Sequence, residues 1–206
     1  MFITLDGGDG CGKSTQVKHL TDYLQSLNRQ TVVCCDPGST PLGDAVRNIL
    51  LHRRELTVAD LTEMFLFMAA RAQLVSEVIR PALAAGKDVV SDRFLLSTYV
   101  YQGYAGGVPA ESLEAAAHIA VGNTVPDLGI VLDIPYEVAV ERLDQRSEPD
   151  RMERKGEEYH RRVREGFLKC AAAEPNRYVV INAAIPADDI AVTIQHIVQK
   201  QIDQKK

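Results

Sequence analysis

The octapeptide GGDGCGKS at residues 7–14 limits the chain to a small group of folds. It fits the phosphate-binding pattern G-x-x-x-x-G-K-[ST], follows the short apolar run Phe2–Leu5 and precedes an amphipathic stretch from Lys13 to Leu27. Glycines let successive backbone N–H groups point at phosphate oxygens, and the positive end of a following helix adds to the attraction. A strand, a glycine-rich loop and a helix in this order predict a nucleoside triphosphate site in an α/β fold.

Individual residues of this loop have expected roles. Lys13 is expected to reach the β- and γ-phosphates, and the hydroxyl of Ser14 can ligate Mg²⁺. The residues expected to surround the triphosphate are Gly7, Gly8, Asp9, Gly10, Cys11, Gly12, Lys13, Ser14 and Thr15.

The rest of the chain alternates between short apolar runs and helical patterns. Continuous apolar runs of this length are typical of strands buried on both faces of a parallel sheet. The further strands predicted in this way are Thr31–Cys35, Asp88–Ser91, Gly129–Ile134 and Tyr178–Ile181. Apolar residues at helical spacing predict helices over Lys13 to Leu27, Leu56 to Leu83, Ala110–Val121, Tyr136–Arg146, Glu157–Ala173 and Ala187–Ile202. Pro81 is expected to bend or end the second of these helices. The alternation predicts an α/β sandwich with a mostly parallel sheet and right-handed crossovers.

Composition excludes several classes of protein. With 206 residues, of which 46% are hydrophobic and 25% charged, the chain can form one domain with a sizeable core. No apolar run approaches the roughly 18 residues of a membrane span, and the N-terminus does not resemble a signal peptide. A net charge of −5 does not favour a nucleic-acid partner.

We expect the four cysteines, which match neither a zinc nor a CxxC pattern, to be free thiols in a reducing cytoplasm.

Three kinds of triphosphate-binding protein compete at this point. A GTPase switch should carry the guanine-reading sequence N-K-x-D, which is absent. An ATP-driven motor or partition protein needs an acid at the end of a strand, and both Asp92 and Asp133 satisfy that requirement. A small-molecule kinase needs an acceptor pocket and a basic lid. The segment Glu141–Glu165 suits a lid, because 16 of its 25 residues are charged and few are large and apolar.

Five blocks in register along nearly the whole chain resemble the thymidylate kinase (dTMP kinase) family. They are residues 2–15 (FITLDGGDGCGKST), 36–40 (DPGST), 66–73 (LFMAARAQ), 91–103 (SDR, ST and YQG) and 150–167 (DRME, YH and VREGF). One block alone would be a weak signal, but five in order are highly specific. The resemblance implies transfer of the γ-phosphate of ATP to dTMP with Mg²⁺. It also implies a five-stranded parallel sheet flanked by helices, with a lid at about residues 142–156 inside a single domain, residues 1–206.

The resemblance also implies which residues hold the acceptor. Phe67 would lie flat on the thymine ring and Arg71, one helical turn later, would bind the acceptor phosphate with its planar fork. Tyr101 would pack near C2′ of the sugar, and the amide of Gln102 would hydrogen-bond the base. The full acceptor set is Asp9, Pro37, Phe67, Arg71, Arg93, Thr98, Tyr101 and Gln102.

The same resemblance implies the residues that act on the transferred group. Arg93 would lie between the donor and acceptor phosphates and offset their charge. Because Gly10 stands where one variant of the family has an arginine, the lid must supply further positive charge, with Arg151 as the leading candidate. The catalytic set is Lys13, Arg93, Asp9, Arg151, Arg146 and Arg142. The metal set is Ser14, Asp9 and Asp92, the last as a partner of Arg93 or of a metal-bound water.

Several positions depart from the family pattern. They are Asp6 and Asp36 for Glu, Ser39 for Gly, Cys35 for Arg, Val100 for Ala and Asn182 for Asp. Because together they affect the acceptor loop around Asp36–Thr40 and could change the choice of acceptor, a kinase for another deoxynucleotide or deoxynucleoside remains an alternative. A P-loop ATPase that acts with a macromolecular partner is the second. The family is usually homodimeric, and the long helix from Leu56 is apolar enough to form such an interface.

Overall fold

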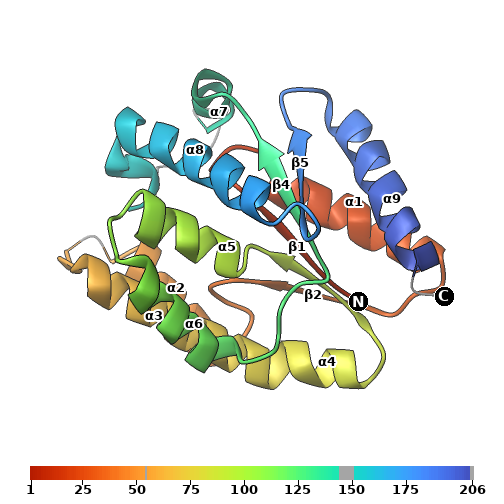
Figure 1. The fold of residues 1–206 in the computed structure, drawn as a ribbon, viewed down its shortest axis with the longest axis horizontal. Helices are drawn as coiled ribbons and strands as arrows, with labels where there is room; N and C mark the ends of the chain where they lie inside the picture. Colours follow the sequence, from red (N-terminus) through yellow and green to blue (C-terminus); the bar gives the residue numbers. More distant parts are fainter. Residues whose placement is uncertain (54, 144–150, 205–206) are drawn as a thin grey trace.

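A computed structural model describes residues 1–53, 55–143 and 151–204. Within them, five strands form one parallel sheet in the order β2-β3-β1-β4-β5 (Figure 1). The strands are β1 Phe2–Gly7, β2 Thr31–Cys35, β3 Asp88–Asp92, β4 Leu128–Asp133 and β5 Tyr178–Asn182. The predicted five-stranded parallel sheet is confirmed, and each predicted strand overlaps an observed one.

Helices connect the strands. In the described ranges they are α1 Lys13–Ser26, α2 Pro41–Leu51, α3 Asp60–Leu74, α4 Arg80–Ala84, α5 Leu95–Thr98, α6 Ala110–Val121, α7 Tyr136–Leu143, α8 Glu157–Ala173 and α9 Ala187–Gln204. Short π-helical turns η1 Val75–Ile79 and η2 Tyr99–Tyr104 and the 3-10 turn η3 Glu153–Lys155 complete the set. The predicted helix from Leu56 instead begins at Asp60 and contains the π turn η1. Pro81 lies at the start of α4, which continues from η1 and ends at Ala84, so the helix ends three residues after the proline.

Helix α2 was not predicted, although its first residues carry a capping signal. Thr40 has extended backbone angles, and its Oγ1 accepts a hydrogen bond from the N–H of Gly43 at 2.9 Å. Pro41 follows at the first helical position, where a fixed φ favours helix initiation. The helix places Arg47 near the carboxyl end of β2, where Arg47 Nη1 donates to the carbonyl of Pro37 at 2.9 Å.

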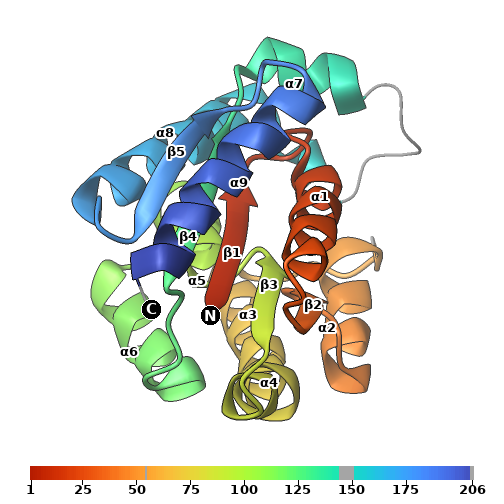
Figure 2. The ribbon, with the colours of Figure 1, turned by 90° about the vertical axis from the view of Figure 1, so that its right-hand side faces the viewer.

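The sheet is covered on both faces. Helices α1 and α9 pack on one face, and α3, α5 and α8 on the other (Figure 1). Figure 2 shows α1 and α9 side by side across the strands, and they contact each other directly. Buried apolar residues of β1, α1 and α9 form the first core: Ile3, Leu5, Val17, Leu20, Leu24, Ile190, Ile194 and Val198. Burial on both faces explains why the strands read as continuous apolar runs.

Parallel strands bring their carboxyl ends to one edge of the sheet. The N–H of Asp36, after β2, donates to the carbonyl of Asp92 at 3.0 Å, and the N–H of Arg93, after β3, donates to the carbonyl of Leu5 at 2.9 Å. These bonds tie the segments after β1, β2 and β3 together. The polar residues that follow three different strands therefore lie at a common site.

Among the described residues, no helix is both long enough and apolar enough to cross a membrane. All four cysteines are free thiols, as the sequence predicts.

Candidate active site

The loop between β1 and α1 presents backbone N–H groups at the start of α1. Gly12 caps this helix with φ +92°, no side chain caps its first turn, and no acidic residue lies in that turn. The N–H groups and the positive end of the helix are thus available to an anion. Gly10 has φ +75°, and a Cβ there would lie 2.7 Å from the carbonyl oxygen of Ala139. The loop can take this path only with glycine at that position.

Lys13 and Ser14 begin α1 beside this loop. The ammonium group of Lys13 donates to the carbonyls of Gly8 at 2.9 Å and Gly7 at 3.3 Å. Ser14 Oγ donates to Asp92 Oδ2 at 3.1 Å. A hydroxyl and a carboxylate are the hard oxygen ligands that Mg²⁺ prefers, and phosphate oxygens and water usually complete its shell. No group of three or more acidic, His or Cys side chains in the described ranges could hold a metal alone. The donor set therefore fits a magnesium ion that is bound together with phosphate.

Two of the pockets at this edge of the sheet contain most of the predicted site residues. The first, here called the P-loop pocket, is lined by Asp9, Gly10, Gly12, Lys13, Ser14, Cys35, Asp36, Arg47, Asp92, Arg93 and Glu153. The second, here called the α3 pocket, is lined by Asp9, Asp36, Pro37, Arg47, Leu51, Phe67, Arg71, Arg93, Ser97, Thr98, Tyr101, Gln102 and Met152. All eight residues predicted to hold the acceptor line this second pocket. The two pockets share Asp9, Asp36, Arg47 and Arg93, so they meet at these side chains.

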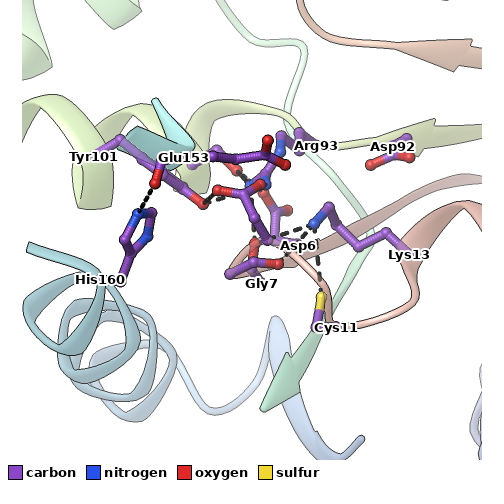
Figure 3. Close-up of polar contacts among 12 residues, drawn as sticks. Asp6, Gly7, Cys11, Lys13, Asp92, Arg93, Tyr101, Glu153 and His160 are labelled. Atoms are coloured by element: carbon purple, nitrogen blue, oxygen red, sulfur yellow. Dashed lines mark hydrogen bonds and ion pairs between the residues drawn. The ribbon is translucent and has the colours of Figure 1, made fainter. Parts of the chain in front are cut away.

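Arg93 lies where the pockets meet, and its polar contacts are drawn in Figure 3. Its Nη2 donates to Asp9 Oδ1 at 2.6 Å and its Nη1 to the carbonyl of Gly7 at 2.8 Å. The guanidinium carbon also stands 5.0 Å from the centre of the Tyr101 ring. The backbone of Arg93 has φ +70°, a conformation that is uncommon outside glycine and clusters at functional sites.

Asp9 is negatively charged in this arrangement. Burial favours the neutral carboxyl, but Arg93 and Lys13 outweigh it and lower the pKa of Asp9. Tyr101 OH donates to Asp9 Oδ2 at 3.1 Å, and burial raises the pKa of Tyr101 well above its usual value. The phenol therefore remains a hydrogen-bond donor at neutral pH, and Asp9 holds both Arg93 and Tyr101 in place.

Arg71 is the largest fully buried side chain of the described chain and is only 1% exposed. Its Nε donates to Asp36 Oδ2, and its Nη2 donates to Thr98 Oγ1 at 2.9 Å. Burial raises the pKa of Asp36, although Arg71 opposes the shift. The other oxygen of Asp36, Oδ1, is buried without a hydrogen-bond partner among the described residues. The pair holds the guanidinium plane at the wall of the α3 pocket.

Glu63 and Arg47 are among the charged groups of the site that sequence reasoning missed. Glu63 is 2% exposed and accepts hydrogen bonds from Gln102 Nε2 at 2.9 Å and from Arg151 Nη2 at 2.6 Å. Its spacing was a usable signal, because Glu63, Phe67 and Arg71 recur every four residues and share one face of α3. Arg47 lines both pockets, but it lies on α2, the helix that was not predicted.

The lid arginines lie in different places. Arg142 lines a separate pocket with Gly10, Cys11, Gly12, Thr15 and residues 185–187. Arg146 lies outside the described residues. Arg151 contacts Glu63 and donates through Nε to the carbonyl of Leu50 at 2.7 Å, which places it beside α2 and α3. A role for Arg151 at the donor phosphates stays a prediction and requires Arg151 to leave Glu63.

Two departures from the family pattern have a local structural basis. Ser39 has φ +62°, the conformation that favours the family's glycine, and its Oγ accepts a hydrogen bond from the N–H of Cys35 at 2.9 Å. Asp6 is fully buried, and its Oδ1 accepts a hydrogen bond from Ser97 Oγ at 2.7 Å. Both side chains are therefore held in place by hydrogen bonds within the site.

Comparison with known proteins agrees with this geometry. The sequence model of the family described as "Thymidylate kinase" matches residues 5–194. A protein of that name from Symbiobacterium thermophilum is 42% identical over 205 residues, covering 100% of this chain and 95% of the relative. Another from Marinomonas sp. is 39% identical and covers 97% of this chain and 94% of the relative. The crystal structure of thymidylate kinase from Ehrlichia chaffeensis superposes with a TM-score of 0.78 at 30% identity, covering 97% of this chain and 98% of that one. With its phosphate-binding loop, its second pocket and these relatives, the chain belongs to the thymidylate kinase family.

Proposed function

We propose that this chain transfers the γ-phosphoryl group of ATP to dTMP and produces ADP and dTDP. One observation supports the transfer most directly. The P-loop pocket and the α3 pocket meet at Arg93 and Asp9, so two phosphate-bearing ligands would face each other there. Membership of the family favours dTMP as acceptor and argues against an ATPase that depends on a macromolecule.

The donor triphosphate would lie along the loop after β1, with its terminal phosphates at Lys13. When bound, Mg²⁺ would neutralise phosphate charge, and Ser14 and Asp92 are the side chains placed to hold it. Lys13 Nζ would move from the carbonyls of Gly7 and Gly8 onto phosphate oxygens. Because the loop and the start of α1 already position their backbone N–H groups, these donors need little reorganisation when charge develops in the transition state.

The acceptor would occupy the α3 pocket. Phe67 would stack on the base and the buried guanidinium of Arg71 would bind the 5′-phosphate, since an arginine fork matches phosphate oxygens. Tyr101 and Asp9 would face the sugar. Arg93, which lines both pockets, would offset charge on the phosphoryl group during transfer. The chain's contribution is therefore to position the two ligands and to balance their negative charge.

The decisive experiment measures ADP formation from ATP and Mg²⁺ with a panel of dTMP, dUMP, dCMP, dGMP, AMP, UMP and thymidine. Strong turnover with dTMP supports the proposal. Turnover only with another nucleotide or with thymidine would keep the kinase and replace the acceptor. Slow hydrolysis that no acceptor stimulates would overturn the proposal.

We infer that residues 142–156 act as a lid in a single domain spanning residues 1–206.

Leu61 and Phe65 on α3 are 51% and 56% exposed, and Ile119 on α6 is 85% exposed, which suits a homodimer interface. Phe65→Ser should convert the dimer to a monomer in sedimentation experiments. Four free thiols suit the reducing conditions of the cytoplasm.

A further inference from the structure

The side-chain amide of Gln102 could face a ligand in either of two orientations. Its side chain is 2% exposed at the wall of the α3 pocket, on the π turn η2. A primary amide has a donor end and an acceptor end of nearly the same shape, so shape alone does not decide which end faces a ligand. Only the hydrogen-bonding partners of the amide can do so.

Glu63 supplies such a partner. Its carboxylate comes from the first turn of α3, and its Oε1 accepts a hydrogen bond from Gln102 Nε2 at 2.9 Å. A carboxylate offers only acceptors, so the reversed amide would direct its oxygen at another oxygen in a buried site. The contact therefore selects one of the two amide orientations.

Arg151 and Lys155 balance the charge of Glu63. Arg151 Nη2 lies 2.6 Å from Glu63 Oε2, and Lys155 Nζ lies 3.5 Å from Glu63 Oε1. Both cations lie within ion-pair distance of the carboxylate oxygens. Glu63 thus connects the segment of Arg151 and Lys155 to the amide in the acceptor pocket.

The selected orientation has a chemical consequence. With one Nε2 hydrogen on Glu63, the amide keeps its second Nε2 hydrogen and its oxygen for the base. A thymine or uracil edge offers a donor at N3 and an acceptor at O4, which complement that pair. Cytosine offers an acceptor at N3 and an amino donor at C4, which do not.

We propose that Glu63 is a specificity-determining positioning residue that fixes the Gln102 amide for a 4-oxo pyrimidine and against a 4-amino pyrimidine. This inference rests on the proposed function, because it requires a pyrimidine nucleotide in the α3 pocket. Glu63 acts through Gln102 and needs no contact with the substrate.

The test compares kcat/KM for dTMP, dUMP and dCMP in the wild type and in Glu63→Gln. The wild type should favour dUMP over dCMP by about a hundredfold or more, because a mismatched edge leaves buried polar groups unpaired. Glutamine at position 63 can donate or accept, so the Gln102 amide can reverse. The preference for dTMP over dCMP should then fall by about tenfold or more. The ratio of dTMP to dUMP should not change, because these bases share the edge that faces the amide.

Lys155→Met is the matched control. It removes a cation from the same carboxylate but leaves the acceptor facing Gln102, so the dTMP to dCMP ratio should stay at its wild-type value. If Glu63→Gln does not fold, adding Arg151→Gln removes the partly buried cation that has lost its carboxylate, and the ratio still reports on Gln102. A loss of activity common to both acceptors cancels in that ratio.

The outcomes separate the two proposals. If the wild type turns over no pyrimidine nucleotide, the proposed function itself is wrong. If the wild type uses dTMP but accepts dCMP as well as dUMP, the orientation of the Gln102 amide does not determine which pyrimidine is accepted. If the folded Glu63→Gln or double variant keeps the wild-type ratio, Glu63 does not set the specificity.

Discussion

Arg93 Nη2 lies 2.6 Å from Asp9 Oδ1, and this ion pair stands where the P-loop pocket meets the α3 pocket. The arginine follows β3 and the aspartate follows β1, so the parallel sheet brings them together at its carboxyl edge. Asp9 holds the guanidinium in place, which in the proposed reaction would lower the cost of organising positive charge around the transferring phosphoryl group.

Replacing Arg93 should therefore act on the chemical step. Arg93→Met should lower kcat by about a thousandfold, as expected when an arginine that stabilises phosphoryl transfer is lost. Steady-state kinetics with dTMP and ATP would measure the loss, and circular dichroism would confirm the fold. Arg177→Met is a control, since Arg177 pairs with Glu174 on the surface, and its kcat should equal that of the wild type. A similar kcat in both variants would contradict the assignment.

Arg71 should determine affinity for the acceptor phosphate. Arg71→Lys keeps a positive charge opposite Asp36 but loses the fork that reaches Asp36 and Thr98 together. We expect KM for dTMP to rise about tenfold or more, the scale of a lost charged hydrogen bond, while KM for ATP stays constant. An unchanged KM for dTMP would refute the role given to Arg71.

Gly10 should tolerate no side chain. In Gly10→Ala the new Cβ meets the Ala139 carbonyl, so the loop must shift and the affinity for ATP should fall about tenfold or more. Gly86→Ala is the matched control, since Gly86 has φ +72° and a Cβ added there would meet nothing within 4 Å. It should show the cost of a left-handed alanine alone, about 1 kcal/mol of stability. Calorimetric titration with a non-hydrolysable ATP analogue would measure the affinity of the Gly10→Ala and Gly86→Ala variants. Equal ATP affinity in both variants would show that the loop adapts.

Asp88 should make stability depend on pH. Burial favours its neutral form, but hydrogen bonds from Arg29 and from the N-terminal ammonium group outweigh it and lower the pKa of Asp88. A carboxylate with a lowered pKa stabilises the fold above its unfolded pKa, and this stabilisation is lost as the pH falls through the folded value.

Asp88→Asn should accordingly lower the free energy of unfolding by about 2 kcal/mol at neutral pH. Urea denaturation of both proteins at several pH values would test it. The difference between them should shrink as the pH is lowered below about 4. A difference that stays constant over this range would mean that the ion pair is not its source.

Much of the site was predictable because its signals are local. The triphosphate loop is encoded by glycines that permit positive φ next to an apolar strand, and all eight predicted acceptor residues line one pocket. Residues that depended on an unrecognised element were missed. Arg47 lies on α2, whose start is signalled only by the cap of Thr40 and Pro41. Glu63 was missed because no local pattern shows that this acid is buried against Gln102, which lies 39 positions further along the chain.

Local sequence was enough to predict the succession of strands along the chain, the phosphate-binding loop and the types of side chain available for the proposed phosphoryl transfer. These follow from hydrophobic periodicity and from backbone conformations that neighbouring residues dictate. Which charges meet depends on the packing of distant segments. Arg151 and Glu63 lie 88 positions apart, and Arg71 and Asp36 lie 35 apart. Such pairs form because the packing of α3 against its neighbours removes water, so that a buried charge is stable only beside groups that pair with it, and no local pattern records which groups these are.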